Sequence, residues 1–329
     1  MSGTPKIGLL LGSLQNPAEF VSAAQAAERA GFDEIWVSED YFMTAGFSVA
    51  ASVLATTSLP VGIGIVPAVT RHPGVLAMEI ATLACMFPGR LHAGIGSGVA
   101  EWLDQMKLRP RSPLGSVRNT IAALRMLLAG AKLDAEYPTF AAEDIVLTHP
   151  PRVVPPLYVG ASGPKALQMS GEISDGTVLS VMAGVEYVRW AREQIVAGGG
   201  GPDHRIAALT FFALNEDRDT AREHVRETFA SYLLVGPRNP MTTVQGIADE
   251  AEAIAAMDPA EATAEIPNQW LDDLTVQGNR FDCAGRIHEM GNAGADSVVL
   301  CFTEDRPLVE MIDQVGRDVL PLLRNRQPA

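Results

Sequence analysis

The chain has 329 residues, 47% of them hydrophobic, which is enough for two ordinary domains or for one large barrel. Its 25 lysines and arginines are outnumbered by 39 aspartates and glutamates, and the formal net charge of -14 repels phosphodiester backbones and anionic lipid surfaces. Apolar stretches fall well short of the ~20 residues that a membrane span needs, so we expect no nucleic-acid partner and no membrane partner.

Short apolar runs alternate with segments of helical period, which is the pattern of parallel strands joined by helices. In the first half, strands are predicted at Ile7–Leu11, Glu34–Ser38, Val61–Val66 and Leu91–Ser97. Helices are predicted at Pro17–Ala30, after Pro73 and after Pro113, because proline favours the first helical turn. The stretch 131–156 is interrupted by prolines, and we expect a short extra hairpin within it.

The same alternation continues in the second half. Strands are predicted at Leu157–Gly160, Gly176–Val181, Ile206–Leu214 and Ser297–Phe302, and helices from Pro164 and at Glu186–Val196, Asp217–Leu234, Phe281–Met290 and Leu308–Leu322. The segment Gly236–Gln277 is longer than an ordinary loop and carries an acidic, alanine-rich helical pattern. We interpret this segment, 236–277, as a helical insertion after strand seven that covers the barrel mouth. Eight strand–helix repeats predict an α/β protein, a single (β/α)8 TIM barrel over residues 1–329.

Acids and glycines gather where the predicted strands end, which is where TIM barrels carry their chemistry. Glu39, Asp40 and Tyr41 follow the second strand, either as a surface loop or as two acids beside a phenol at the barrel mouth. Gly62 and Gly64 interrupt the third strand. Such glycines mark a bulge required by packing or a close approach of the backbone to a ligand, and the residues alone leave both interpretations open.

Two neighbouring strands end in small residues. The fourth runs into Gly94–Gly98, which includes Gly96 and Ser97, and the fifth runs into Gly160, Ala161, Ser162 and Gly163 directly before a helix. A helix that starts after such a turn presents free N–H groups to an anion. Together the two turns predict a site for a phosphorylated cofactor, although neither is a Walker loop or the G-x-G-x-x-G fingerprint.

A series of motifs in one order resembles the luciferase-like monooxygenases, and in particular their branch that depends on the deazaflavin coenzyme F420. The motifs are A-E-R-A-G-F-D-E-I-W-V-S-E-D at 27–40, V-T-R-H-P at 69–73, G-R-L-H-A-G-I-G-S-G at 89–98, P-L-Y-V-G-A-S-G-P at 156–164, D-G-T-V at 175–178 and A-G-A-D-S-V-V-L at 293–300. The resemblance covers most of the chain and implies a (β/α)8 barrel with an insertion after strand seven.

The resemblance also implies which residues bind the cofactor. They are Asp40, Gly64, Ile65, Gly96, Ser97, Ala161, Ser162 and Gly163. A cis peptide bond at Gly64–Ile65 would lie behind the cofactor ring, and Ser97 would supply a hydroxyl. The turn 161–163 would hold the cofactor phosphate through its amides, and Asp40 matches an acid near the polar edge of the deazaflavin.

This sequence differs from members of the branch at positions that take part in their reactions. Its sugar-phosphate dehydrogenases carry His and Glu where this chain has Tyr41 and Val99, so their proton-transfer pair is absent. Its methylene-tetrahydromethanopterin reductases carry an acid where this chain has Leu10. We therefore predict Asp40 and Tyr41 as the catalytic residues. Asp40 would hydrogen-bond the ring, and Tyr41 would donate a proton or orient the substrate.

Other reactive side chains are expected to be structural. Glu39 is a partner for Arg71 or a surface acid, and His92 should face the helices or the packed interior. Histidines and cysteines show no ligand spacing, so we expect no metal. Cys85, Cys283 and Cys301 lie far apart in apolar runs and are expected to be buried thiols. With no signal-peptide pattern at the start, a reducing cytoplasm is the expected location.

The leading hypothesis is an F420-dependent oxidoreductase that transfers a hydride between the deazaflavin C5 and a small organic substrate. A close rival is an FMN-dependent monooxygenase that uses molecular oxygen. A second alternative, from a different functional class, is a barrel that binds a flavin without turnover. Barrels of the family often pair through helices near strands two and three, so the resemblance also implies a homodimer.

Overall fold

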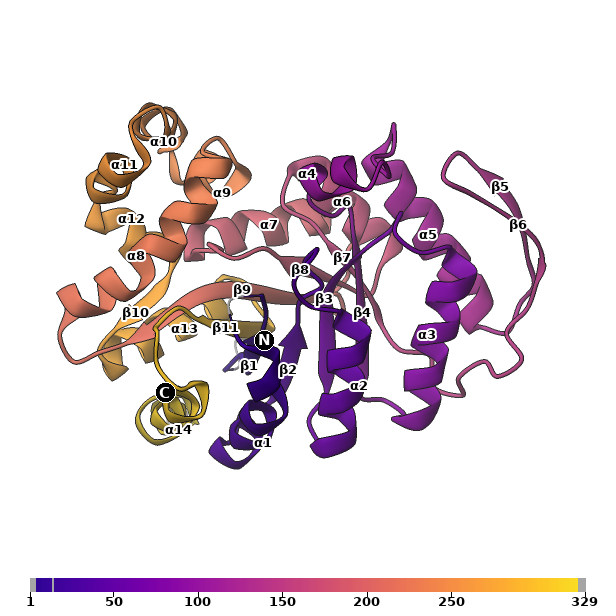
Figure 1. Cartoon of the computed structure of the whole chain (residues 1–329), viewed down its shortest axis with the longest axis horizontal. Helices are drawn as coiled ribbons and strands as arrows, with labels where there is room; N and C mark the ends of the chain where they lie inside the picture. The colour runs from indigo at the N-terminus through magenta and orange to yellow at the C-terminus, as the bar shows by residue number, and fades with distance from the viewer. Residues whose placement is uncertain (1–3, 14, 325–329) are drawn as a thin grey trace.

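The computed structural model describes residues 4–13 and 15–324, which form a closed ring of eight parallel strands (Figure 1). In ring order the strands are β1 (Lys6–Leu11), β2 (Glu34–Val37), β3 (Val61–Pro67), β4 (Leu91–Gly96), β7 (Leu157–Gly160), β8 (Gly176–Leu179), β9 (Arg205–Leu214) and β11 (Ser297–Phe302). Pairing of β8 with β9, of β9 with β11 and of β11 with β1 closes the ring. The predicted (β/α)8 barrel is confirmed, with strand bounds within two residues of the prediction.

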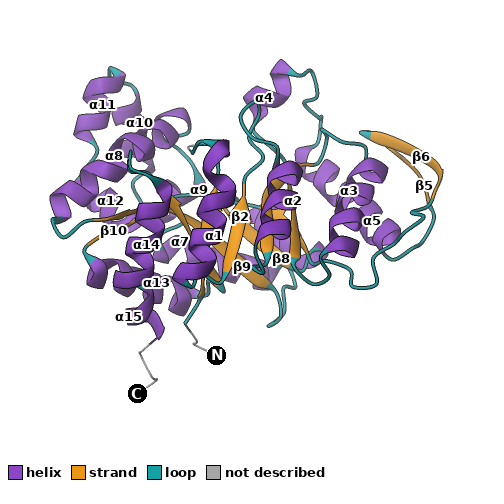
Figure 2. Cartoon of the chain, turned by 60° about the horizontal axis from the view of Figure 1, so that its bottom comes forward, coloured by secondary structure: helices purple, strands orange, loops and turns teal. Residues whose placement is uncertain are grey.

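Helices cover the outside of the ring (Figure 2). They are η1 (Pro17–Glu19), α1 (Phe20–Ala30), α2 (Gly46–Thr56), α3 (Pro73–Met86), α5 (Pro113–Leu128), α6 (Pro164–Ile173), α7 (Val185–Ala197), α8 (Arg218–Val235), α13 (Arg280–Ala293), α14 (Leu308–Asp318) and α15 (Leu320–Arg324). The short helix α4 (Ala100–Gln105) follows β4 at the carboxyl ends of the strands. The predicted starts at Pro73, Pro113 and Pro164 are confirmed, each with proline at the first position. Helices α2 and α4 were not predicted. Neither begins with a capping side chain, which is the sequence signal for the start of a helix.

Two further segments stand outside the ring. The expected hairpin is confirmed as β5 (Leu133–Tyr137) and β6 (Phe140–Ile145). The segment 236–277 forms four short helices, α9 (Pro240–Gln245), α10 (Ala248–Ala255), α11 (Pro259–Glu265) and α12 (Asn268–Leu274), and leads into β10 (Val276–Gly278). Helices α10, α11 and α12 contact α8, α9 contacts α7, and β10 pairs with residues 212–214 at the carboxyl end of β9 (Figure 1). The insertion therefore packs on α7 and α8, next to the carboxyl end of β9.

Aromatic rings fill the barrel interior below the ends of the strands. The ring centroid of Trp36 lies 5.5 Å from that of Tyr158 and 6.2 Å from that of His92. The indole N–H of Trp36 donates a hydrogen bond of 2.6 Å to buried Glu34. Burial lowers the pKa of His92, which lies in the packed interior as expected. This part of the barrel is a packed core, as is usual for the fold.

A glycine opposite the indole makes this packing possible. A Cβ atom on Gly62 would lie 2.5 Å from the Trp36 ring, and a Cβ on Gly176 would lie 2.4 Å from the Tyr158 ring. Real side chains do not approach so closely, so only glycine leaves room for the rings at these positions. Of the two interpretations of the glycines in β3, packing therefore accounts for Gly62.

One of the three cysteines departs from the prediction. Cys283 and Cys301 are buried as expected, but Cys85 is exposed, so its predicted burial is wrong. Helix α3 carries apolar residues on its inner face, such as Leu76, and also on its outer face, such as Met86. An apolar neighbourhood in the sequence therefore did not distinguish the two faces.

Among the described helices, none is both long enough and apolar enough to span a membrane.

Replacing Gly62 by alanine is expected to lower the free energy of unfolding by about 1 to 3 kcal/mol, because the added methyl group overpacks the interior against Trp36. Gly285, inside α13, is the matched control, because a Cβ there meets nothing within 4 Å. Gly285→Ala should be neutral or stabilise by about 0.5 to 1 kcal/mol. Urea denaturation followed by circular dichroism measures both changes, and equal stability of the two variants would contradict the tight packing around the indole.

Candidate active site

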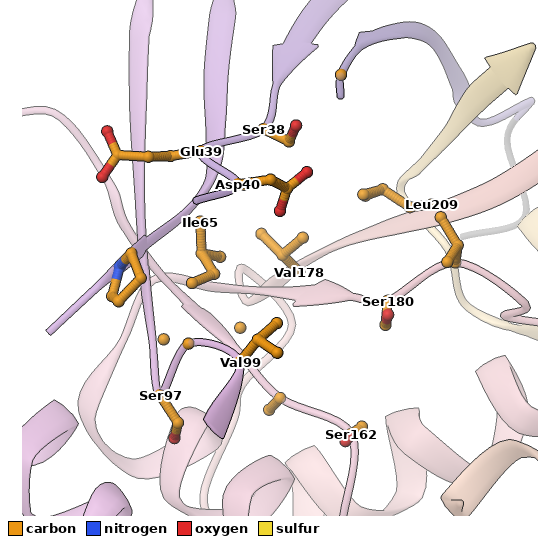
Figure 3. A pocket seen from close by; sticks show the side chains of 18 of the residues that line it. Ser38, Glu39, Asp40, Ile65, Ser97, Val99, Ser162, Val178, Ser180 and Leu209 are labelled. Carbon is orange, nitrogen blue, oxygen red and sulfur yellow. The ribbon is translucent and has the colours of Figure 1, made fainter. Parts of the chain in front are cut away.

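A cavity of about 510 Å³ lies at the carboxyl ends of the ring strands (Figure 3). Most of the residues predicted to bind the cofactor line it, namely Asp40, Gly64, Ile65, Gly96, Ser97, Ala161 and Ser162. Gly163 is the next residue along and is the N-cap of α6. The ends of parallel strands meet at one edge of a barrel, which explains why residues more than a hundred positions apart come together. The cavity is of the size that binds small molecules and cofactors.

The wall formed by β3 depends on Ile65. The register between β3 and β4 shifts between Ile63 and Val66, and the Gly64–Ile65 peptide bond is cis, as the resemblance implied. The side chain of Ile65 lies at the centre of the cavity view (Figure 3). A Cβ atom on Gly96 or on Gly160 would lie 2.8 Å from Ile65, so both positions leave room for that side chain. Gly64 therefore borders the cavity, whereas Gly62 packs on the tryptophan.

The turn after β7 leaves backbone amides free from Ser162 onward, whereas the amide of Ala161 donates to the carbonyl of Val178 over 3.1 Å and is not available to a phosphate, contrary to the expectation for that residue. It leads into α6, whose first residue is proline and whose N-cap is Gly163 without a capping side chain. No described atom lies within 4 Å of a Cβ built on Gly163. Buried Tyr187 donates a hydrogen bond of 2.8 Å to the carbonyl of Ser162 and so holds the turn in place. The first N–H groups of α6 and the hydroxyls of Ser97 and Ser162 form one end of the cavity (Figure 3), an environment that suits an anion.

The opposite end of the cavity carries a carboxylate. Asp40 points into the cavity (Figure 3), and its Oδ2 accepts a hydrogen bond of 2.9 Å from the Ser13 hydroxyl. Next to it, the hydroxyl of Ser38 is buried and has no hydrogen-bond partner among the described residues. Such unpartnered hydroxyls are rare in native interiors. The Ser38 hydroxyl is therefore free to form a hydrogen bond with a bound ligand.

Two further residues with reactive groups line the cavity, and sequence reasoning missed their position. Tyr232 comes from α8, and its pKa is raised by burial, with Cys301 and Asp40 adding to the shift. Burial and the charge of Asp40 raise the pKa of Cys301 to about 12, so this thiol stays neutral at physiological pH. Tyr232 sits in a helix with an ordinary amphipathic pattern, which contains no signal for a cavity residue. Cys301 could have been found from its place near the end of a predicted strand.

The two adjacent acids after β2 lie in different surroundings. Both carboxylate oxygens of Glu39 accept hydrogen bonds from Arg71, at 2.5 Å and 2.9 Å, and the Gly46 amide donates another at 3.1 Å. Glu39 is 3% exposed, so its prediction as a partner of Arg71 is confirmed and the surface alternative is wrong. A buried acid in this setting is held by charge-assisted, two-pronged hydrogen bonds.

Tyr41 belongs to the same network. Its hydroxyl donates to Glu39 over 2.8 Å and lies 2.8 Å from the Thr70 hydroxyl. Burial raises its pKa to about 12, and the Glu39 carboxylate adds to the shift. Tyr41 is not among the described residues that line the cavity. Of the two residues predicted to be catalytic, the structure thus brings Asp40 to the cavity and turns the hydroxyl of Tyr41 toward Glu39.

Known proteins resemble this chain over nearly its whole length. The curated relatives include a 5,10-methylenetetrahydromethanopterin reductase of Methanolobus tindarius, 29% identical over 312 residues, which cover 90% of this chain and 94% of that protein. An F420-dependent glucose-6-phosphate dehydrogenase of Beutenbergia cavernae is 28% identical over 94% of this chain and 95% of that protein. Among solved structures, the coenzyme F420 dependent tetrahydromethanopterin reductase of Methanopyrus kandleri superposes with a TM-score of 0.82 at 24% identity, covering 97% and 99% of the two chains.

The sequence profile of one family matches most of the chain. It is described as luciferase-like monooxygenase, and the match covers residues 3–297. The match contains the other seven strands of the ring and ends at Ser297, the first residue of β11. The chain belongs to the luciferase-like monooxygenase family.

Proposed function

We propose that this protein is an oxidoreductase that uses coenzyme F420 for hydride transfer to or from a small organic substrate. The supporting observation is that Asp40, Ile65, Ser97 and Ser162 line one and the same cavity. Curated relatives that match more than nine tenths of the chain are named as F420-dependent or as methylenetetrahydromethanopterin reductases, and they support the choice of cofactor.

The residues present fit such a cofactor. The free amides of the α6 start, with the Ser97 and Ser162 hydroxyls, would hold its phosphate. Ile65 would contact the flat ring, and Asp40 with Ser38 would hydrogen-bond the polar edge of the ring. When bound, the deazaflavin accepts or supplies the hydride. The protein's part is to orient it and to keep water from the reacting face.

Two parts of the proposal concern residues outside the cavity. Tyr41 would be a positioning residue, because its hydrogen bond to Glu39 braces the segment that carries Asp40. We also propose that the insertion, 236–277, covers the mouth when substrate binds. None of its residues lines the described cavity, so covering the mouth requires α9 to α12 to move toward it.

Replacing Ser162 by aspartate is expected to weaken F420 binding by about tenfold or more, because it places a negative charge where the phosphate should bind. Ser22→Asp, on the exposed surface of α1, adds the same charge far from the cavity and should leave binding unchanged. Quenching of F420 fluorescence measures both affinities. Tight binding of FMN with oxygen consumption, and no binding of F420, would overturn the proposed cofactor in favour of a monooxygenase.

Asp40→Ala and Tyr41→Phe separate a cavity residue from a positioning residue. Asp40→Ala should lower kcat by about a hundredfold if it acts directly at the ring. Tyr41→Phe should change kcat by less than about threefold while lowering the free energy of unfolding by about 1 kcal/mol, because one hydrogen bond to Glu39 is lost. Turnover and urea denaturation are measured on both variants. A large loss of kcat in Tyr41→Phe without loss of stability would instead make Tyr41 a proton donor.

The outer face of α3 supports the homodimer that the resemblance implied, and we propose it as the contact. Val75, Met78, Thr82, Cys85 and Met86 recur three, four or seven residues apart on one side of the helix, and all are exposed. Phe42 and Met43, in the loop after β2, are also exposed. Exposed apolar surface of this kind is typical of a protein–protein interface.

Sedimentation at micromolar concentration should therefore show a dimer. Joint replacement of Met78 and Met86 by lysine should give a monomer with an unchanged circular dichroism spectrum, because two charges cannot be buried unpaired in the contact. Val196→Lys changes an equally exposed apolar residue on α7 and should leave the dimer intact. A wild-type monomer, or a dimer that tolerates both lysines, would contradict this interface.

A further inference from the structure

The cavity contains no positively charged side chain. Among the described residues that line it there is no lysine, arginine or histidine. The nearest arginine in the network, Arg71, is already shared by Glu39 and Glu79, whose carboxylates lie 2.5 Å and 2.9 Å from it. Lys165, near the start of α6, is exposed and does not line the cavity. The cavity therefore offers no cation to an anionic substrate.

The charge that remains in the cavity is negative. Asp40 accepts a hydrogen bond from Ser13 but has no basic partner among the described residues. Its carboxylate would repel an anion that enters this end, and the apolar surroundings strengthen the repulsion. One place suits an anion, the start of α6, and the proposed function assigns it to the cofactor phosphate. A second phosphate or carboxylate would have no cationic partner among the described lining residues.

The rest of the cavity suits an uncharged molecule. Its walls include the apolar side chains of Leu10, Val99, Trp102, Leu114, Val181 and Leu209. Its polar side chains away from Asp40 and the start of α6 include the hydroxyls of Ser180 and Tyr232. Ser180 is exposed, and its hydroxyl can donate to a carbonyl or accept from an alcohol. Apolar walls with a few hydroxyls recognise small neutral molecules.

We propose that the substrate is a small, uncharged, mainly apolar alcohol or ketone, and that the cavity discriminates against anionic substrates such as sugar phosphates. This inference rests on the proposed function for the place of the cofactor. It separates the chain from its relative in Beutenbergia cavernae, which is named for glucose 6-phosphate.

Three matched alcohols test the proposal: cyclohexanol, 4-hydroxycyclohexanecarboxylate and protonated 4-aminocyclohexanol. They share a ring and a secondary hydroxyl and differ in charge. With F420 and the wild-type protein, kcat/KM for the carboxylate should be at least about tenfold lower than for cyclohexanol, whereas the ammonium compound should suffer less. Equal values for the carboxylate and cyclohexanol would overturn the proposal.

Val99 allows the discrimination to be reversed. It lies on the cavity wall, is 41% exposed and therefore tolerates a longer side chain. Val99→Lys should raise the kcat/KM of the carboxylate relative to cyclohexanol by about tenfold, because it supplies the missing cation. Val99→Met is the matched control, with similar length and no charge, and should leave the ratio unchanged. Equal ratios in the two variants would contradict an electrostatic origin of the discrimination.

A binding measurement distinguishes failure of this inference from failure of the proposed cofactor. Quenching of F420 fluorescence tests the cofactor by itself. Saturation-transfer NMR then follows the three alcohols on protein with and without F420, and it detects weak binding without turnover. Binding of cyclohexanol in preference to the carboxylate supports the charge inference even if F420 does not bind. Preference for the carboxylate, or no binding of any of the three, overturns it.

Discussion

The position of one indole ring determines where the barrel stops being a packed core and becomes a cavity. Trp36 fills the interior at the level of Gly62, and its ring also lies 3.2 Å from the place of a Cβ on Gly64. Gly64 borders the cavity, so the indole lies directly beneath the cavity floor. The hydrogen bond to buried Glu34 fixes the ring, because a buried carboxylate without a donor would be costly. The depth available to any ligand depends on this packing.

Above that floor, the two ends of the cavity differ in electrostatic character. One end carries the free amides at the start of α6, and the other end carries Asp40. Glu39, next in the chain, points the other way (Figure 3) and is neutralised by Arg71. Neighbouring side chains on an extended chain point in opposite directions. Both acids border the cavity, but only Asp40 projects into it, while the carboxylate of Glu39 bonds to Arg71 and anchors the segment. The unequal ends would orient a molecule that has one anionic group and one polar, uncharged edge.

Much of the fold and part of the site could be predicted from the sequence. Apolar runs and helical periods located every strand of the ring, because each strand is buried on both faces. The glycine-rich and serine-containing turns came together because strand ends share one edge of the barrel. Helix α2 was missed, since its alanine-rich sequence shows neither a cap nor a strong stripe.

The remaining features depend on contacts between distant residues. The hydroxyl of Tyr41 lies between Glu39, which Arg71 holds, and Thr70, 29 residues further on, and no local pattern reveals these partners. Tyr232 reaches the cavity because α8 packs on β9, where the tyrosine ring lies 5.1 Å from that of Phe211, and its helix looks ordinary in sequence. Ser38 was counted as the last residue of a strand, and only the structure shows that its hydroxyl lacks a partner.

The exposure of Cys85 has a practical consequence. The other two thiols, of Cys283 and Cys301, are buried, and burial raises the pKa of each, so a maleimide reagent would react with Cys85 first. In the monomer the Cys85 thiol is the accessible labelling position, whereas the α3 contact proposed above would cover it in the dimer. The rate of maleimide reaction at Cys85 would therefore follow the fraction of the protein that is monomeric.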